Sequence, residues 1–248
     1  MRNDHPLGAF LETLDETFTA EALFDQMSDT VFFIKDLNGR YLCVNDTLVK
    51  RSGRHKKHEL IGQLPSDLFG VDLGRSYEAQ DLVVIESGKP LFDKLELHRH
   101  IGQDTGWCLT TKIPLRSKTG DVVGLTGLSR DLATPDPSSS DYAQVATAIR
   151  FAKARRNAPP SIHEMANAAS MSIYQLDRRI KKLFGLTTGQ WILKSRIELA
   201  CELLGEHGCT LADVADECGY ADQSTFTRQF KRTTGRTPSA FRGALRCG

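Results

Sequence analysis

The chain has 248 residues, of which 40% are hydrophobic and 25% are charged, and its formal net charge is +1. This length accommodates two domains that each bury a core, and the charge content is ordinary for a globular protein. The first ten residues contain no signal-peptide core, and apolar runs such as Val31 to Ile34 are far too short to span a membrane. We therefore expect a cytoplasmic protein that makes no contact with the membrane.

The charge is distributed unevenly along the chain. From Asp141 to the end, 16 Lys and Arg stand against 10 Asp and Glu, a balance of +6, whereas the preceding part has a balance of −5. A basic half behind an acidic half is typical of a nucleic-acid-binding module joined to a domain that does not touch nucleic acid. Many solvated domains carry a similar charge, so this signal needs support from motifs.

The six cysteines do not indicate a zinc site. No two of them show the CxxC spacing of such a site, and we expect no bound metal. We interpret all six as reduced thiols, with redox sensing by a pair of them as the alternative. They are Cys43, Cys108, Cys201, Cys209, Cys218 and Cys247.

The front half begins with a helical segment and a hairpin. Residues 1–21 are predicted to be helical, and the spacing of their apolar residues is amphipathic. A β-branched and aromatic run at 30–36 and a return strand at 41–45 flank Asn38 and Gly39. Because Asn-Gly is the strongest short-range signal for a hairpin turn, these two strands are predicted to pair.

The front half continues with helices and then three strands. Short helical segments reach about residue 69, and a longer amphipathic helix is predicted over 72–87. Three extended runs follow, at 91–98, 106–116 and 121–130. This order predicts an α+β domain over residues 22–133, in which a five-stranded antiparallel sheet carries helices on one face.

The order of these elements, with one motif near its start, resembles a PAS domain. The motif comprises Phe33-Ile34-Lys35-Asp36, Gly39-Arg40-Tyr41 and Val44-Asn45. The resemblance implies that the domain holds a small-molecule effector between sheet and helices, or that it serves dimerisation. It also implies a homodimer in which the N-terminal segment from Leu7 to Met27 packs between the subunits.

The same resemblance allows two cofactors to be tested. Haem-binding members use a histidine on the long helix, and the predicted helix at 72–87 contains none. Blue-light flavin members use a reactive cysteine in the helical segment near residues 61–69, and none is there. We therefore expect neither haem nor flavin, and no other cofactor is identified.

Residues 134–141 form a predicted linker between the front domain and an all-α domain over residues 142–246. The linker has two prolines, three serines and no large apolar residue.

The second half contains the same unit twice, at 161–184 and 210–234. In each copy a short helix, a tight turn and a second helix follow one another, which is a helix-turn-helix pattern. Each copy starts with a hydroxyl residue followed three residues later by an acid, a capping box, and ends at a glycine that accepts φ > 0. These residues are Ser161, Glu164 and Gly185 in the first copy and Thr210, Asp213 and Gly235 in the second. A long helix over 188–204 joins the copies at a fixed distance.

A plain helical bundle is the alternative, because any amphipathic helix shows the same apolar spacing. The repeat also matches polar residues, however: Arg178 corresponds to Arg228, and Lys181 to Lys231. Gly219 lies in the second turn, where a glycine lets the two helices pack closely. These matches favour the helix-turn-helix interpretation.

The second copy carries a long motif that resembles the signature of the AraC/XylS family of transcription regulators. The motif reads Gly219-Tyr220-x-x-x-Ser224-x-Phe226-x-Arg228-x-Phe230-Lys231-x-x-x-Gly235-x-Thr237-Pro238-x-x-Phe241-Arg242. The resemblance extends over roughly residues 141–245. The first copy departs from it, because Ile180 replaces the aromatic residue and Thr188 the proline, so base contacts from that copy are less certain.

The PAS-like front domain departs from the sugar-binding barrel that is common in this family. His98-Arg99-His100 raises the alternative of a barrel-type metal site, but Asp104 stands where that pattern would have a glutamate. We expect the two histidines to be exposed on one strand face instead.

The resemblance implies that the second helix of each unit enters a major groove of double-stranded DNA. The first of these recognition helices is predicted over 172–184 and the second over 223–234. Arginine suits guanine, glutamine suits adenine and aspartate accepts from cytosine. The candidate base contacts are Tyr174, Gln175, Asp177, Arg178, Gln223, Ser224, Thr225, Thr227 and Arg228. The candidate phosphate contacts are Lys181, Lys182, Lys231 and Arg232.

Three functions stay open. The first is a one-component regulator, in which an effector at the PAS-like domain controls DNA binding; the family resemblance implies activation and contact with RNA polymerase. The second is a regulator whose front domain serves only dimerisation or docking of a partner protein. The third is an enzyme, for which the sequence contains no nucleophile-base pair, phosphate loop or metal cluster.

Overall fold

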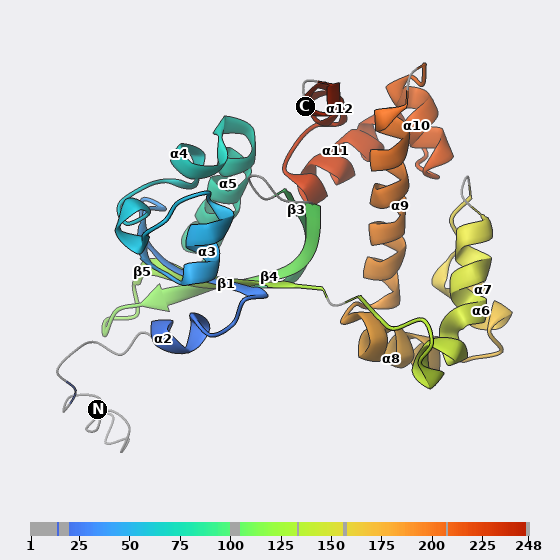
Figure 1. Ribbon diagram of the computed structural model, residues 1–248, viewed down its shortest axis with the longest axis horizontal. Coiled ribbons are helices and arrows are strands. Elements are labelled where there is room, and N and C mark those ends of the chain that lie inside the picture. Colours follow the sequence, from blue (N-terminus) through green and yellow to red (C-terminus); the bar gives the residue numbers. More distant parts are fainter. Residues whose placement is uncertain are drawn as a thin grey trace. The chain divides into compact units, whose positions relative to one another are not determined.

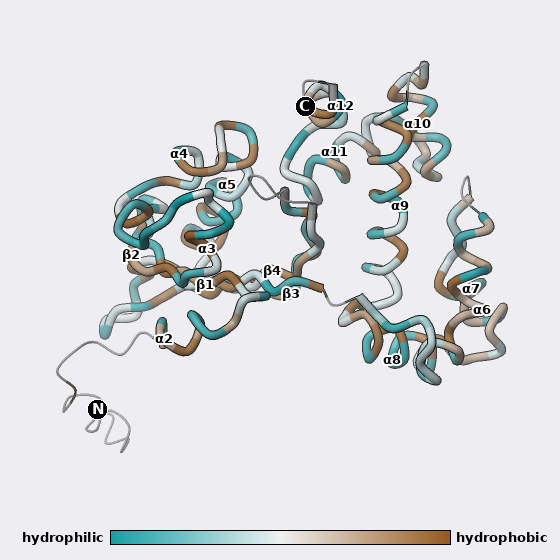
Figure 2. Tube along the Cα trace, in the orientation of Figure 1, coloured by the Kyte–Doolittle hydropathy of each residue, from teal (hydrophilic) through white to brown (hydrophobic). Residues whose placement is uncertain are grey.

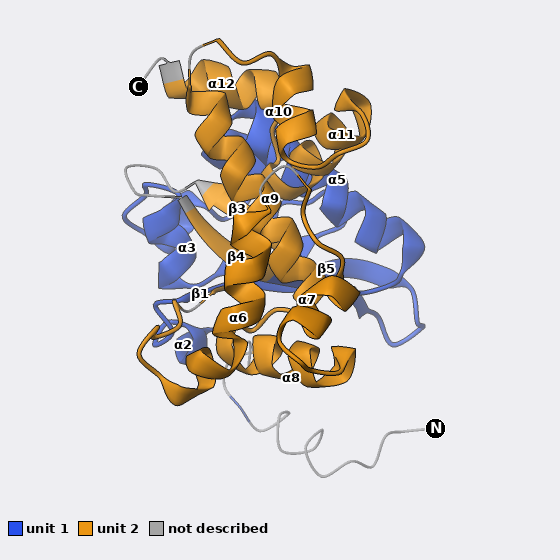
Figure 3. Cartoon of the chain, turned by 90° about the vertical axis from the view of Figure 1, so that its right-hand side faces the viewer, with its two compact units in different colours: residues 1–94, 100–104, 110–130 blue, residues 95–99, 105–109, 131–248 orange. Residues whose placement is uncertain are grey.

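The structure is a computed structural model, and it describes residues 14, 20–99, 105–132, 134–155, 158–206 and 208–246. Most of the predicted N-terminal helical segment lies outside these residues, as do His100 and Asp104. The chain divides into two compact units (Figure 3). The first comprises residues 1–94, 100–104 and 110–130, and the second residues 95–99, 105–109 and 131–248. Parts of two strands therefore group with the second unit.

A five-stranded antiparallel sheet has the strand order β2-β1-β5-β4-β3. Each strand lies within one residue of the run predicted for it, so the predicted sheet is confirmed. The strands are β1 (Thr30–Asp36), β2 (Tyr41–Val44), β3 (Leu91–Arg99), β4 (Thr105–Arg116) and β5 (Val122–Asp131).

Strand β1 pairs with β2 on one side and with β5 on the other. In the β1–β2 hairpin Phe33 faces Val44, and Gly39 in the turn has φ +77°, a conformation that favours glycine. On the other side Phe33 faces Gly127, and its ring fills the space that a Cβ at position 127 would need. The aromatic motif at the start of the domain is thus held in the middle of the sheet.

The helices of the first unit cover both faces of the sheet (Figure 1). Helices α3, α4 and α5 lie over one face, as predicted, and the short helix α2 lies against the other, where Phe24 stacks on Phe32 with ring centroids 4.2 Å apart. These helices are α2 (Glu21–Phe24), α3 (Asp46–Arg51), the 3-10 helix η1 (Lys57–Glu59), α4 (Pro65–Phe69) and α5 (Val71–Ser87). The core beneath them contains Val31, Phe33, Tyr41, Val44, Leu48, Val49, Leu60, Leu68, Val84 and Leu125.

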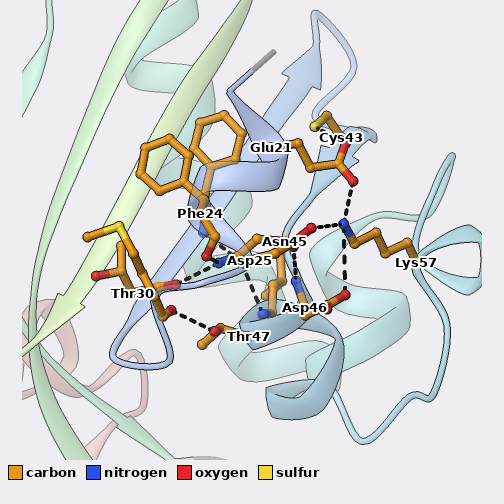
Figure 4. Close-up of polar contacts among 12 residues, drawn as sticks. Glu21, Phe24, Asp25, Thr30, Cys43, Asn45, Asp46, Thr47 and Lys57 are labelled. Atoms are coloured by element: carbon orange, nitrogen blue, oxygen red, sulfur yellow. Dashed lines mark hydrogen bonds and ion pairs between the residues drawn. The ribbon is translucent and has the colours of Figure 1, made fainter. Parts of the chain in front are cut away.

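Asn45 connects three elements of the first unit (Figure 4). Its fully buried side chain donates hydrogen bonds to the carbonyl oxygens of Phe24 and Thr30, at 2.9 and 2.7 Å. The side-chain oxygen of Asn45 accepts from the backbone N–H groups of Phe32 and Leu48, at 3.0 and 3.2 Å. One amide therefore satisfies four backbone groups, in the segment of α2, in β1 and at the start of α3.

A charged cluster holds α2 to the same place (Figure 4). The ammonium of Lys57 binds the carboxylates of Glu21 and Asp25, the latter at 2.7 Å. The thiol of Cys43 in β2 donates to Glu21 at 3.0 Å. Burial acts to lower the pKa of Lys57, but the bonds to Asp25 and Glu21 outweigh it and hold that pKa above its usual value.

The second unit is helical apart from the two strand segments, and its helix boundaries match the predicted ones closely. The one substantial difference is α6, which begins at Ser140, inside the predicted linker of 134–141, because the Ser139 hydroxyl accepts a hydrogen bond from the Tyr142 N–H and caps the helix. The helices are α6 (Ser140–Ala154), α7 (Ile162–Ala168), α8 (Ile173–Phe184), α9 (Thr188–Gly205), α10 (Leu211–Glu217), α11 (Gln223–Thr234) and α12 (Pro238–Arg246).

Helix α9 contributes to two hydrophobic cores. Trp191 near its start packs in the core of the first helix-turn-helix unit, with Val145, Ile149, Met165, Leu176 and Ile180. Its later residues Ile197, Ala200 and Leu204 pack in the core of the second unit, with Val214, Phe226 and Phe230. Figure 2 shows hydrophobic positions recurring along α9 with hydrophilic positions between them. The predicted connecting helix is therefore a shared structural element.

A second contact connects the two helix-turn-helix units. Gly219, in the turn of the second unit, has φ +72°, and a Cβ built there would lie 2.1 Å from Cδ and 2.7 Å from Cγ of Pro159. Pro159 lies in the loop that leads into the first unit. We expected a glycine here to let the helices α10 and α11 pack closely; the structure shows that it also leaves room for the proline ring.

Asn45→Ala should lower the free energy of unfolding by about 2–4 kcal/mol, because it leaves buried backbone N–H and carbonyl groups without partners. Urea unfolding followed by circular dichroism measures this change. Asn38→Ala is the control, since Asn38 is exposed in the hairpin turn, and we expect a change of at most about 0.5 kcal/mol. Equal effects of the two substitutions would contradict the role of Asn45.

Gly219→Ala should lower the free energy of unfolding of the second helix-turn-helix unit by about 2–4 kcal/mol. Strain of about 1 kcal/mol from the left-handed backbone adds to overpacking of about 1–3 kcal/mol against Pro159. Gly185→Ala is the matched control, because Gly185 has φ +69° but its nearest neighbouring atom is 3.9 Å away. Adding Pro159→Ala to Gly219→Ala should recover part of the loss. Urea unfolding followed by circular dichroism measures these changes, and no recovery in the double variant would refute the contact.

Candidate nucleic-acid interface

Helix α8 exposes polar residues opposite a buried apolar side. Its start is held by a reciprocal capping box: the Ser172 hydroxyl accepts from the Gln175 N–H, and the Gln175 side chain accepts from the Ser172 N–H. Leu176 is fully buried. Tyr174, with 74% of its surface exposed, and Arg178 lie on the solvent side of the same turns. These candidate base contacts therefore share one exposed surface.

Helix α11 repeats this arrangement in the second unit. Asp222, which the sequence analysis did not single out, caps the helix by accepting from the Thr225 N–H at 2.7 Å. An aspartate three residues before Thr225 is the signal that would have identified this cap. Phe226 is fully buried, so Arg228 lies exposed on the other side. The candidate residues Gln223 and Ser224 are exposed as well, and Thr225 and Thr227 are half-buried.

Asp177 differs from the other candidate base contacts. Its carboxylate accepts hydrogen bonds from the backbone N–H and the hydroxyl of Thr188, at 2.7 and 2.9 Å. Thr188 is the first residue of α9. Asp177 thus ties the recognition helix α8 to the connecting helix, and its Oδ1 atom accepts both hydrogen bonds. A negative charge at a helix N-terminus also interacts favourably with the helix dipole.

The four candidate phosphate contacts lie at the ends of the recognition helices. Lys181 and Lys182 are exposed in the last turn of α8, and Lys231 and Arg232 in the last turn of α11. Lys182 also forms an exposed ion pair with Asp141 at 2.6 Å. Cations at these positions stabilise a helix C-terminus in any case, so their presence alone does not require a phosphate partner.

The two recognition helices are held at a constant separation. Helix α9 has 18 residues, which corresponds to a length of about 27 Å at 1.5 Å per residue. Both hydrophobic cores pack on this helix, and Pro159, in the loop before the first helix-turn-helix unit, contacts Gly219 in the turn of the second. Two capped helices with exposed polar residues are thereby presented from one rigid support, which is what simultaneous contact with two segments of a duplex requires.

The interior of the first unit contains a charged triad that the sequence analysis missed. The ammonium groups of Lys35 in β1 and Lys112 in β4 each lie 2.6 Å from one oxygen of Asp81 in α5. All three side chains are buried. Burial acts to raise the pKa of Asp81, but the two ammonium groups outweigh it and hold that pKa below its usual value. The alternation of Lys35 with Val31 and Phe33 along β1 was the available signal, because it places Lys35 on the core face.

A pocket of about 390 Å³ lies beside this triad in the first unit. Its walls come from the β1–β2 turn, the start of α4 and one side of α5. Arg75, Glu78 and Asp81 supply its charged groups, and Leu37, Leu64, Leu82 and Ile85 its apolar surface. Such a mixture suits a small polar molecule with an apolar part.

The expectation that His98 is exposed is wrong. Only 15% of its side chain is exposed. The neighbouring Leu95, Glu96 and Leu97 are buried, so both faces of β3 are covered at this point. Its partner in the expected pair, His100, lies outside the described residues.

In the part of the chain that the structure describes, no helix is long and apolar enough to cross a bilayer.

Two protein-family models match the chain. A model described as a helix-turn-helix domain matches residues 165–244, which run from α7 to α12. A model described as the PAS fold matches residues 24–135, which contain the five strands and α3 to α5. Together these matches confirm the predicted fold class, an α+β PAS domain followed by an all-α module with two helix-turn-helix units.

The chain is also similar to several curated transcription regulators. It is 31% identical over 86 residues to the probable transcriptional regulator LumQ of Photobacterium leiognathi, which covers 35% of each chain. It is 35% identical over 88 residues to the probable transcription factor PqrA of Proteus vulgaris, covering 36% of this chain and 72% of PqrA. It is 28% identical over 123 residues to the HTH-type transcriptional activator RhaR of Escherichia coli K12, covering 50% of this chain and 44% of RhaR. The chain thus spans only about a third of LumQ and less than half of RhaR.

The chain is also similar to solved structures. The DNA-binding domain of the global transcriptional factor AdpA, in complex with a target DNA, is 28% identical with a TM-score of 0.40, over 42% of this chain and 94% of that one. An AraC-type regulator from Chromobacterium violaceum is 21% identical with a TM-score of 0.40, over 42% of this chain and 92% of that one.

The family assignment rests on the match to the helix-turn-helix model and on the similarity to PqrA, of which 72% of the length is covered. The matched region, residues 165–244, contains both recognition helices and both terminal glycines, and it begins four residues after the start of the first predicted unit at Ser161. The chain belongs to the AraC/XylS family of DNA-binding transcription regulators and carries a PAS-fold domain in front of its DNA-binding module.

Proposed function

We propose that this regulator binds DNA sequence-specifically through both recognition helices, and that one chain contacts two successive major-groove segments. The observation that carries the proposal is the repeated surface at the start of α8 and α11, where capped helix ends expose polar residues above a buried face. The rigid connection through α9 supports contact with two adjacent DNA elements, so that no palindrome is required.

Within this proposal the exposed residues of each recognition helix have separate tasks. Arg178 and Arg228 bind guanine and Gln223 binds adenine, because their side chains offer the matching donors and acceptors. The side-chain oxygen of Gln175 already accepts from the Ser172 N–H, so Gln175 contacts a base by donating from its amide N–H group. Tyr174, Ser224, Thr225 and Thr227 line the same surface. Asp177 acts structurally, because its carboxylate already accepts two hydrogen bonds from Thr188. Lys181, Lys182, Lys231 and Arg232 bind phosphates and set the salt dependence of binding.

We further propose that the PAS domain receives a small-molecule effector and controls the DNA-binding module. The pocket of about 390 Å³ beside the Lys35–Asp81–Lys112 triad is the candidate binding place. An effector shifts the regulator only if it binds two states with different affinity. The family resemblance favours activation through RNA polymerase, and a regulator that binds chromosomal DNA acts in the cytoplasm of a bacterium.

A PAS domain that serves only dimerisation is the second candidate function. Helix α2 supports it, because Leu23 has 66% of its surface exposed while Asn45 and Lys57 hold the helix firmly to the sheet. An apolar residue presented on an anchored helix is suited to contact a second subunit. In this case the front domain positions two DNA-binding modules without any effector.

Arg228→Ala should weaken binding to the specific site by about 1–3 kcal/mol and relax the sequence preference there. Lys231→Ala should weaken specific and non-specific binding alike and reduce the salt slope by about 1. Fluorescence anisotropy on specific and scrambled duplexes measures both effects. Arg54→Ala removes an exposed arginine from the first unit and should leave binding unchanged. An unchanged ratio of specific to scrambled affinity in Arg228→Ala would refute the base contact.

Native mass spectrometry of the freshly purified protein separates the two candidate roles of the PAS domain. If it binds an effector, we expect extra mass that disappears on denaturation. A dimer at the bare protein mass, with no added mass after incubation with extracts of the source cells, would favour the dimerisation role. A visible absorption band would overturn our expectation that neither haem nor flavin binds.

A further inference from the structure

Three side chains with complementary chemistry meet where β3 and β4 run side by side. Glu96 and His98 lie two residues apart on β3, and Cys108 lies on β4. The sulfur of Cys108 is 3.4 Å from Nδ1 of His98, and Nε2 of His98 is 3.5 Å from a carboxylate oxygen of Glu96. A thiol beside an imidazole that is oriented by a carboxylate is the arrangement that activates a sulfur nucleophile.

The surroundings of Cys108 differ from those of the other thiols. Burial raises the pKa of Cys201 to about 12, and acidic neighbours add to this effect. Burial also raises the pKa of Cys218 to about 12, although Arg196 acts to lower it, so both thiols are protonated at neutral pH. The thiol of Cys43 donates its proton towards the carboxylate of Glu21. Cys108 has an imidazole beside it instead, and a cation beside a thiol favours the reactive thiolate.

The charge state of His98 is consistent with such a pair. Burial acts to lower the pKa of His98, but the interactions with Cys108 and with the carboxylate of Glu96 outweigh it and raise the pKa to about 10. An imidazolium at neutral pH stabilises the thiolate beside it. Cys108 itself is fully buried, whereas His98 retains 15% exposure of its side chain.

We propose that Cys108 is a site of oxidation by peroxides, activated by His98 and with Glu96 as the residue that positions the imidazole. The thiolate sulfur attacks one peroxide oxygen, and an S–O bond forms while the O–O bond breaks. The leaving hydroxide takes a proton from the His98 imidazolium and departs as water. Sulfur loses two electrons, the peroxide gains them, and the product is a sulfenic acid.

The position of Cys108 connects this chemistry to the DNA-binding module. Residues 105–109 belong to the second compact unit. The neighbouring Trp107 donates a hydrogen bond from its indole N–H to Glu198 of α9, at 3.1 Å. An added oxygen at a fully buried sulfur must displace its neighbours, and α9 supports both recognition helices. That oxidation alters DNA binding rests on the proposed function, whereas the reactivity of Cys108 does not.

The test treats the full-length protein with hydrogen peroxide in the presence of dimedone and measures adducts at each cysteine by mass spectrometry. An ordinary thiol is about 3% ionised at pH 7, and the lower nucleophilicity of a stabilised thiolate offsets part of its higher abundance. We therefore expect Cys108 to react about tenfold faster in the wild type than in His98→Gln. His58→Gln, at an exposed histidine of η1, should have no effect.

The pH profile provides a readout that does not depend on a variant. Between pH 6 and 8 the wild-type rate at Cys108 should rise much less than tenfold per pH unit, because the proposed His98 imidazolium favours the reactive thiolate beside it. A rate that rises tenfold per pH unit over this range would overturn the proposal, as would labelling of Cys108 no faster than that of Cys201.

DNA binding of the oxidised wild type and of Cys108→Ser is then measured separately. Fast oxidation with unchanged DNA binding would refute only the regulatory consequence, and failure of the unoxidised protein to bind DNA would refute the proposed function.

Discussion

The arrangement of the DNA-binding module depends on one constraint, the packing of two hydrophobic cores on a single helix. Trp191 belongs to the first core, and Ile197 and Leu204 belong to the second, so α9 cannot move relative to either unit without exposing apolar surface. The contact of Pro159 with Gly219 adds a second connection between the units. Recognition helices supported in this way keep a constant separation, which is the property that the proposed contact with two successive DNA segments requires.

The first unit is organised by polar groups that must satisfy one another. Asn45 serves four backbone groups, and Asp81 holds two lysines in the space between α5 and the sheet. Removing one partner from such a network leaves a buried charge or an unpaired donor, which costs far more than the pair contributes. An effector that altered these contacts would therefore change the free energy of the domain by a large amount. Such an effector would also alter the attachment of α2, because Asn45 and Lys57 connect this helix to the sheet.

Most of the fold could be predicted because its signals are local. Helix caps, terminal glycines, the Asn-Gly turn and the alternation of β1 act within a few residues, and the predicted strands and recognition helices match the observed ones to within one residue. The start of α6 was the exception, since Ser139 caps a helix inside a stretch whose composition is typical of a linker. The family signature added the arrangement of the two units, which composition alone would not distinguish from a helical bundle.

The sequence by itself determined the elements, the repeat and the family, because hydrogen bonding at helix ends and apolar periodicity depend on neighbouring residues. Only the tertiary structure decided which polar side chains are already engaged. Asp177 looks like its exposed neighbours until Thr188 is placed beside it. The alternation of β1 places Lys35 on the core face, but only the fold brings Asp81, 46 residues away in the sequence, within hydrogen-bonding distance of it. The environment of Cys108 follows the same principle. A side chain's charge and availability depend on partners that the fold brings near, and no local pattern specifies them.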